Sequence, residues 1–387
     1  MPMKTVSFVI PVYNPPEERF RALLESVLSQ EGVAVEVVAV NDGSTNNALD
    51  ILREFEASNP GKMTVIDQKN VGEGPSRNEG FRHATGDYIW FVDCDDLVRP
   101  GAAAYLVDAI DKTGADQIMF AAVTCTPLDD KPFPEEWTDV VRPTTALAEI
   151  ARHRIGAWYR MSRRSFLERV GVRYCNAKTG ADGPESLRWA FEAHSLVQVD
   201  DPCYKYIMAP GSSSQAPADV RLFTTGWQIM DVYGGLRERF PRYASWIDLW
   251  NYIRARGHLA MAESYLSEED RHAPDDIETV RRARDEYRKR FDTLDGGNPL
   301  IALYDFARAV GRRDLRPRLL ETAKKAASLR EEVARLKREG TQLKREAAQL
   351  KREADRLGGE VEALRKSLSW RITAPLRAIL RPFVRGR

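Results

Sequence analysis

Three aspartates close together are the residues of this sequence best suited to chemistry. Asp93, Asp95 and Asp96 follow directly on residues 88–92, the apolar run YIWFV. An apolar run of that length predicts a buried strand. Carboxylates at its end cannot be buried there without a compensating positive charge. A divalent metal carrying an anionic ligand is the economical candidate, because carboxylate oxygens suit magnesium or manganese.

The elements that must position these aspartates are predicted to alternate between strand and helix. Apolar runs predict strands, and helical spacing of apolar residues predicts helices between them. The strand candidates are residues 6–12, 35–40, 63–66, 88–92 and 116–123. This alternation predicts an α/β fold with an open, mostly parallel sheet and helices on both faces.

Ligands of such sheets bind beyond the carboxyl ends of the strands. Residues 11–14, Asp42 and residues 93–96 each follow or end a predicted strand. They are therefore expected on one rim, although they are far apart in sequence.

Composition describes a globular protein without an overall charge preference. The chain has 387 residues, of which 43% are hydrophobic and 30% charged, and its formal net charge is +1. That balance gives no general attraction to nucleic acid. Four cysteines without a CxxC pair indicate reduced thiols in a cytosolic protein. Cys94, between two acids, should have a raised pKa and is not expected to be a nucleophile.

The N-terminus does not resemble a signal peptide, and no apolar run is long enough to span a bilayer. We therefore expect a cytoplasmic protein that can be peripheral at the inner face of the cell membrane. The length predicts a catalytic domain with additions. The predicted divisions are a catalytic domain at 1–215, a helical accessory region at 216–325, a coiled coil at 326–368 and a basic amphipathic tail at 369–387.

The coiled-coil prediction rests on a seven-residue repeat. Leu-Lys-Arg-Glu begins at Leu336, Leu343 and Leu350, and small or apolar residues hold the a and d positions without a slip from 326 to 368. Sustained heptads of this kind predict a coiled coil. Glu339 and Lys344 have the spacing that pairs charges between parallel chains, which favours a parallel homo-oligomer. A single solvated helix with internal ion pairs is the alternative.

The tail combines five arginines with tryptophan, leucine and phenylalanine and contains no acid. Such a segment can lie in an anionic headgroup layer, so a membrane surface is one predicted partner. Docking on the protein itself, or disorder, is the alternative. The segment SLSWRITAPLR also resembles a tail found in bacterial surface-polysaccharide glycosyltransferases.

Four segments, in this order and spacing, resemble the family 2 inverting glycosyltransferases of the A-type nucleotide-sugar fold. They are VSFVIPVYN, VNDGSTNN, NVGEGPSRNEGFRHATGDYIWFVDCDDLVRPG and YRMSRRSFLERVGVRY. The likeness covers about residues 4–215. It implies a nucleotide-diphosphate sugar donor and a divalent cofactor, Mn²⁺ or Mg²⁺.

The resemblance assigns the donor side residue by residue. Asp42 would bind the base of the nucleotide, Asp93 the ribose or metal, and Asp95 the metal that bridges the diphosphate. Arg77 would lie near the base and diphosphate. Pro11 and Tyr13 would also contact the nucleotide sugar. From the residues alone, Asp42 could instead cap a turn, Arg77 could form a surface ion pair, and Asp96 is expected to cap the turn after the strand.

Inverting transfer needs a base that takes the proton of the acceptor hydroxyl. The family uses the aspartate of a Glu-Asp pair, and here the matching residues are Ala181 and Asp182. Asp182 is therefore the expected base, with Glu185 as second choice. The missing glutamate is a departure from the family pattern. Trp158 and Arg164 are expected on the acceptor side, although Trp158 could equally be core.

The sequence thus predicts a metal-dependent, inverting, hexosyltransferase-like enzyme. It would move a sugar to a hydroxyl of a surface glycan or lipid-linked oligosaccharide. The alternative is a catalytically degenerate domain that serves as a coiled-coil scaffold in a polysaccharide-assembly complex. A sugar nucleotidyltransferase is disfavoured, since the first strand is followed by Pro-Val-Tyr-Asn-Pro and not by a Gly-rich phosphate loop.

Overall fold

The structure, a computed structural model, divides the chain into two units, Met1–Ala302 and Leu303–Arg387. The described residues are 3–126, 129–146, 156–177, 180–208, 220–268 and 272–294. The predicted coiled coil at 326–368 and tail at 369–387 lie outside them. Both therefore stay predictions.

The N-terminal half of the sheet is parallel, as predicted. Strands β1 to β4 alternate with helices α1 to α3 and are arranged in the order β3-β2-β1-β4. The bounds are β1 Thr5–Val12, α1 Glu17–Leu28, β2 Ala34–Asp42, α2 Ala48–Ser58, β3 Met63–Gln68, α3 Glu73–His83 and β4 Tyr88–Phe91. The apolar strand runs therefore correctly located this half of the sheet.

The second half of the sheet is mixed. The full order is β3-β2-β1-β4-β8-β6-β9-β5, with β7 paired to β9. Here β6 and β9 are parallel, while β8 runs antiparallel to both β4 and β6. The remaining elements are β5 Leu97–Val98, α4 Ala102–Thr113, β6 Gln117–Cys125, β7 Val141–Thr144, the 3₁₀ turn η1 Ala157–Tyr159, β8 Arg160–Arg163, α6 Arg164–Val170, α7 Asp182–Glu192 and β9 Leu196–Ile207.

The expectation of a mostly parallel sheet therefore holds for part of the sheet only, because β8 runs antiparallel to its two neighbours. The segment RMSR contains a single apolar residue, so it carries no periodic signal of its own. Hydrogen bonds to a strand on each side and burial of its first three residues make it a strand.

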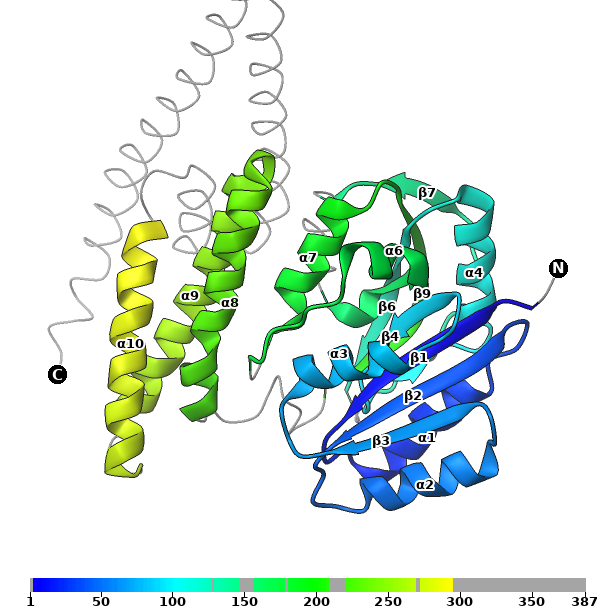
Figure 1. The fold of residues 1–387 in the computed structure, drawn as a ribbon, viewed down its shortest axis with the longest axis horizontal. Coiled ribbons are helices and arrows are strands. Elements are labelled where there is room, and N and C mark those ends of the chain that lie inside the picture. Colours follow the sequence, from blue (N-terminus) through cyan, green and yellow to red (C-terminus); the bar gives the residue numbers. More distant parts are fainter. Residues whose placement is uncertain are drawn as a thin grey trace, which may run out of the picture. The chain divides into compact units, whose positions relative to one another are not determined.

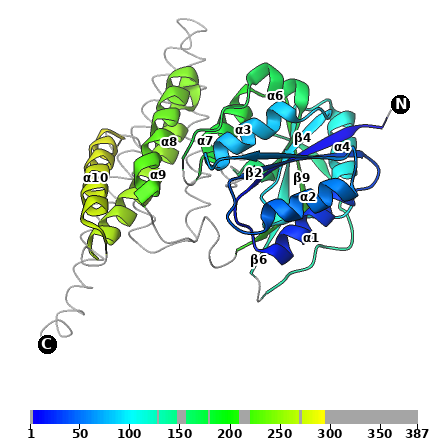
Figure 2. The ribbon, with the colours of Figure 1, turned by 60° about the horizontal axis from the view of Figure 1, so that its bottom comes forward.

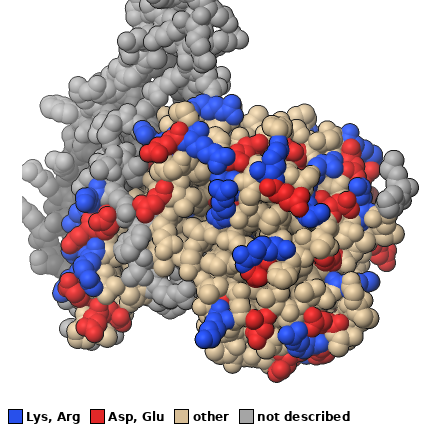
Figure 3. Space-filling view, in the orientation of Figure 1, with Lys and Arg blue, Asp and Glu red and all other residues tan. Residues whose placement is uncertain are grey.

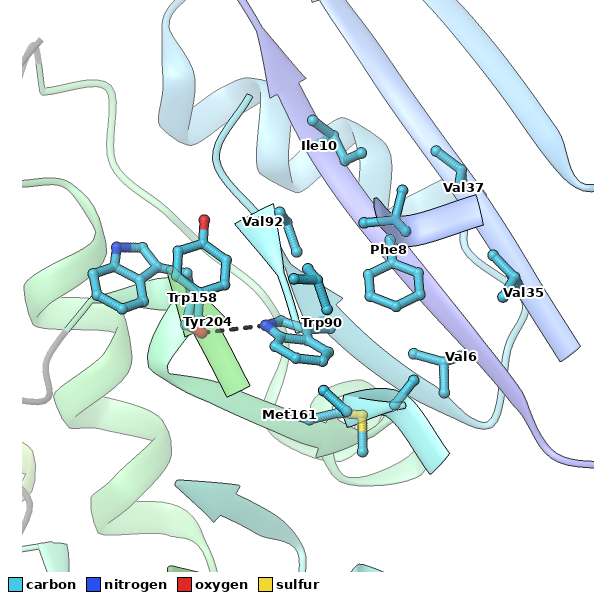
Figure 4. Close-up of a cluster of buried hydrophobic side chains, with 14 of the residues drawn as sticks. Val6, Phe8, Ile10, Val35, Val37, Trp90, Val92, Trp158, Met161 and Tyr204 are labelled. Atoms are coloured by element: carbon cyan, nitrogen blue, oxygen red, sulfur yellow. Dashed lines mark hydrogen bonds between the residues drawn. The ribbon is translucent and has the colours of Figure 1, made fainter. Parts of the chain in front are cut away.

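Helices cover both faces of the sheet (Figures 1 and 2). Alternating side chains of the central strands pack against these helices. One face buries Phe8 and Trp90 with residues of α1, α2 and α4, and the other buries Val9 and Phe91 with residues of α3, α6 and α7. Figure 4 shows the first of these clusters, in which the Trp90 indole N–H donates to the carbonyl oxygen of Trp158 at 3.2 Å. The two-sided core fixes where β1 and β4 end, and so where the polar residues after them begin.

Beyond the sheet, the described residues 220–268 and 272–294 are mostly helical, in agreement with the helical accessory region predicted from residue 216. The elements are α8 Val220–Arg239, the 3₁₀ turn η2 Pro241–Tyr243, α9 Ala244–Leu266 and α10 Pro274–Leu294. The three helices share a core that includes Phe223, Val280 and Tyr287. Phe191 at the end of α7 stacks on Tyr243 with ring centroids 4.2 Å apart. Arg239 pairs with Glu192 at 2.8 Å, so α8 and the turn after it are fastened to α7.

Charges of both signs are interspersed on the face of the molecule shown in Figure 3. This matches the near-zero net charge of the sequence. None of the helices in the described residues combines the length and the apolar character needed to cross a bilayer.

Candidate active site at the carboxyl ends of the strands

A buried arginine joins two of the strand-end loops. Arg77 on α3 is 1% exposed and donates to Asp93 Oδ1 at 2.6 Å. It also forms an ion pair with Glu73, one turn earlier on the same helix. Its guanidinium lies 5.4 Å from the ring centroid of Tyr174. Arg77 is thus a buried connector and not the surface ion pair that was its alternative interpretation.

More negative than positive charge gathers around this guanidinium. Burial opposes the charged form of Arg77, but the Glu73 and Asp93 carboxylates outweigh that effect and hold its pKa well above the usual value. Burial also raises the pKa of the Asp93 carboxyl; Arg77 opposes this rise, whereas Asp95 and Asp182 add to it. A further cation would relieve this repulsion.

Asp42, at the end of β2, is 2% exposed and organises the loop before α3. Its Oδ1 accepts from the Val71 N–H and its Oδ2 from the Gly72 N–H, both at 2.8 Å. Gln68 donates to Oδ1 at 2.9 Å. The carboxylate therefore holds residues 71–72 at the rim, a contact that the sequence did not indicate.

The end of β1 lies beside the same rim. Pro11 is buried in β1 opposite Val40, whereas Tyr13 is 50% exposed. Between this end and the Asp-Gly-Ser-Thr loop, Asn14 Oδ1 accepts from the Thr45 N–H at 2.7 Å. Of the two predicted contacts, only Tyr13 has a side chain exposed to a ligand.

Asp95 and Asp96 have different environments. Asp95 is half-buried, forms no ion pair with another described side chain, and has a carboxyl pKa raised by burial. Asp96 is 1% exposed and accepts from the Ile207 N–H at 2.8 Å. The prediction that Asp96 caps the turn after the strand is therefore wrong. Its carboxylate instead bonds to the backbone of β9.

Asp182 is the first residue of α7 and lies near Arg77 and the acids around it. Its Oδ2 accepts from the Ala157 N–H at 3.2 Å. It is close enough to raise the pKa of the Asp93 carboxyl. Ala181, at the position of the family's glutamate, is buried and supplies no second acid. The structure thus brings the predicted base close to Arg77 and Asp93, two of the predicted donor residues.

Glu185, the second choice for the base, is a structural residue. Its Oε2 accepts from Arg188 Nε at 2.8 Å, and its Oε1 accepts from Arg188 Nη2 at 2.5 Å and from the Arg173 N–H at 2.7 Å. The two side chains of this ion pair are 4% and 7% exposed. Both carboxylate oxygens are committed, so Glu185 is unsuited to proton transfer.

The other residues considered from the sequence have no direct part in the predicted chemistry. Trp158 is 7% exposed and stacks on Tyr204 with centroids 4.6 Å apart, so it belongs to the core. Arg164 pairs with Glu168 at 2.8 Å, and its N–H donates to the Asp87 carbonyl at 2.9 Å, at the end of β4 opposite Asp93, which contradicts its expected place on the acceptor side. Burial, with the nearby Asp95, raises the pKa of the Cys94 thiol well above normal, which agrees with an unreactive cysteine.

Two contacts that the sequence did not predict hold α3 to the segment before α7. Asn78 Nδ2 donates to the Tyr174 carbonyl, and the Tyr174 N–H donates to Asn78 Oδ1, both at 2.9 Å. A Cβ added at Gly74 would lie 2.1 Å from the Cys175 carbonyl oxygen, so the close approach requires glycine. Of the site residues that the sequence analysis missed, only Glu73 could have been found from the sequence, because it lies four residues before Arg77 on a predicted helix.

A divalent cation fits this set of donors only together with a ligand. In the described part of the chain, no three histidine, cysteine or acidic side chains are grouped so that they could hold a metal. Magnesium and manganese are commonly bound by one or two carboxylates, with substrate phosphates and water completing the shell. Asp95, with Asp93 beside it, could supply that part.

Comparison with known proteins identifies the domain that carries the donor-side residues of the site. Residues 7–170 match the sequence profile of glycosyl transferase family 2. They form a family 2 glycosyltransferase domain. The resemblance inferred from the four sequence motifs is thereby confirmed.

Two relatives share parts of the chain. YibD of Escherichia coli (strain K12), described as an uncharacterized glycosyltransferase, is 27% identical over 54% of this chain and 63% of its own length. ExoO of Rhizobium meliloti (strain 1021), a succinoglycan biosynthesis protein, is 36% identical over 28% of this chain and 31% of its own. The chain thus spans less than two thirds of either relative.

The fold has a counterpart among solved structures. S. aureus TarS residues 1–349, crystallised with UDP-GlcNAc, superpose with a TM-score of 0.56 and 18% identity, covering 84% of this chain and 92% of that one. This likeness supports the α/β fold with flanking helices.

The contrast between Glu185 and an exposed acid can be measured. Replacing Glu185 with glutamine is expected to lower the free energy of unfolding by roughly 2–4 kcal/mol, because the buried Arg188 loses its bidentate partner. The matched control is Glu168→Gln, which breaks an ion pair whose acid is 52% exposed and should cost no more than about 0.5 kcal/mol. Denaturant unfolding of both variants measures this, and equal losses would contradict the structural role of Glu185.

Proposed function

We propose that this chain is an inverting, metal-dependent glycosyltransferase. It would transfer one sugar from a nucleotide-diphosphate donor to a hydroxyl of a surface glycan or lipid-linked oligosaccharide. The observation that carries the proposal is the convergence of Asp93 and Asp182 on the buried Arg77, with Asp95 beside Asp93. The family 2 match of residues 7–170 supports it.

The nucleotide sugar would bind at the rim formed by the carboxyl ends of the strands. A nucleotide base would lie against the exposed Tyr13, beside the loop that Asp42 holds, and the diphosphate would approach Asp93 and Asp95. A bound Mn²⁺ or Mg²⁺ would neutralise the negative charge that develops on the departing diphosphate. TarS, crystallised with UDP-GlcNAc, supports a donor of this class.

The acceptor hydroxyl would bind beside Asp182. Its carboxylate would take the proton of the acceptor hydroxyl as that oxygen forms a bond to the anomeric carbon. The bond from the anomeric carbon to the diphosphate oxygen breaks, and the nucleoside diphosphate leaves with the electron pair. ExoO, a succinoglycan biosynthesis protein, supports a polysaccharide acceptor.

A non-catalytic scaffold is not favoured. That alternative was motivated by Ala181 in place of the family's glutamate. The single remaining carboxylate, Asp182, nevertheless lies close enough to Asp93 to influence its pKa. One base is sufficient for the proposed proton transfer.

The decisive variant is Asp182→Asn, which keeps the shape of the side chain and removes the base. Sugar transfer is expected to fall by roughly 10²–10⁴-fold, because the acceptor hydroxyl keeps its proton. Nucleotide-sugar binding, measured by calorimetry with manganese present, should persist. Glu168→Gln, which changes an exposed acid on α6, is the control for transfer. Full transfer activity in Asp182→Asn would refute the assignment of the base.

We further propose that the chain forms a parallel homo-oligomer through residues 326–368, with the basic tail at a membrane surface. The Leu-Lys-Arg-Glu heptads and the acid-free tail support this organisation. Light scattering should give a multiple of the chain mass for the full chain and the monomer mass for a chain that ends at residue 325. A monomeric full chain would contradict the coiled coil.

A further inference from the structure

A guanidinium from the helical region lies beside the proposed base. Gly180 precedes α7 with φ +73°, and a Cβ added there would lie 2.1 Å from Nη2 of Arg254, a residue of α9. The guanidinium therefore packs directly on the backbone of Gly180. The Gly183 N–H donates to the Gly180 carbonyl at 3.3 Å, which closes a turn whose third residue is Asp182. Such a turn keeps its ends within about 7 Å, so Arg254 lies in the immediate region of Asp182.

The buried Tyr233 is influenced by both Arg254 and Asp182, which also indicates that these two charges lie close together. Tyr233 of α8 is 1% exposed, and burial raises the pKa of its phenol above the usual value. Arg254 lowers that pKa and Asp182 raises it, so both charges lie within reach of the same hydroxyl. The helical region thus contributes to the acceptor side of the site.

Arg254 has no direct ionic partner among the protein residues that the structure describes, Asp182 included. Arg254 forms no ion pair with any of them, whereas Arg237 pairs with Asp248 at 2.9 Å and Arg239 with Glu192 at 2.8 Å. One turn along α9, His258 is fully buried, and burial together with Arg254 lowers its pKa to about 4. His258 is therefore neutral at physiological pH and supplies no counter-charge.

A half-buried guanidinium without a carboxylate loses hydration and gains no ion pair. Its planar donors match the two oxygens of a carboxylate or phosphate. The donor diphosphate is expected at Asp93 and Asp95, whereas Arg254 lies beside Asp182, where the acceptor hydroxyl must arrive. An anion that reaches Arg254 would therefore belong to the acceptor.

We propose that Arg254 binds a phosphate or carboxylate group of the acceptor, next to the hydroxyl that Asp182 deprotonates. This inference rests on the proposed glycosyltransferase function and names the chemical class of its acceptor. The anion can come from the diphosphate of a lipid carrier or from a phosphodiester or uronic acid within the glycan. In either case the helical region selects the acceptor, while the sheet domain binds the donor.

Transfer to matched acceptors tests the proposal with the full chain and manganese. The acceptors are neutral alkyl glycosides, the same sugars as alkyl glycosyl diphosphates, and oligosaccharides that contain uronic acid or phosphodiester groups. Release of nucleoside diphosphate gives kcat and KM for each class. The wild type should prefer one anionic class at low salt, and the preferred class identifies the source of the anion. Arg254→Gln should lower that preference at least roughly tenfold, mainly through KM.

Two further variants separate recognition from structural damage. Arg254→Lys should retain part of the preference because it keeps the charge, and Arg256→Gln, on the same helix, should retain all of it. Added salt should reduce the preference of the wild type but not that of Arg254→Gln. A wild type that prefers neutral acceptors, or an Arg254→Gln variant that loses activity on all classes equally, would overturn the proposal. Absence of donor hydrolysis and transfer in the wild type would instead refute the glycosyltransferase function, and this inference with it.

Discussion

The ion pairs of Arg77 with Asp93 and Glu73 are the contacts on which the rest of the site depends. Arg77 comes from α3 and Asp93 from the loop after β4, so their contact ties the crossover helix to the carboxyl end of the strand that it leads into. Removing either partner would leave a charge in a poorly hydrated place, which is strongly unfavourable. The same guanidinium faces Tyr174, whose backbone is held by Asn78. The donor edge and the segment that leads to Asp182 therefore share one anchor.

Arg77 does not neutralise all of the negative charge at the carboxyl ends of the strands. One guanidinium faces Glu73 and Asp93, with Asp95 and Asp182 nearby, and the raised pKa of the Asp93 carboxyl reflects the remaining repulsion. A protein that only needed stability would replace such acids with apolar residues. Retaining them is sensible if a cation joins the site together with a diphosphate, since the ion then provides both the missing positive charge and the affinity for the donor.

The parallel half-sheet and its strand-end acids were predictable from the sequence because they depend on local patterns. Apolar runs gave the strands, and the rule for strand ends placed Asp42 and Asp93 on one rim. The antiparallel strand β8 was not predictable, since its pairing is decided by the neighbours β4 and β6. The roles of Asn78 and Glu185 depend on partners far along the chain or on burial, and Arg254 comes from a region without a recognisable motif. None of these contacts leaves a periodic signal.

The need for a cation at the end of β4 is tested most directly by calorimetric titration of the full chain with UDP, with manganese present and again with the metal chelated. If the carboxylates at the end of β4 require a cation to accept a diphosphate, chelation should weaken binding at least about tenfold, and Asp95→Asn should bind equally weakly in both conditions. Equal affinity of the wild type with and without metal would contradict the account.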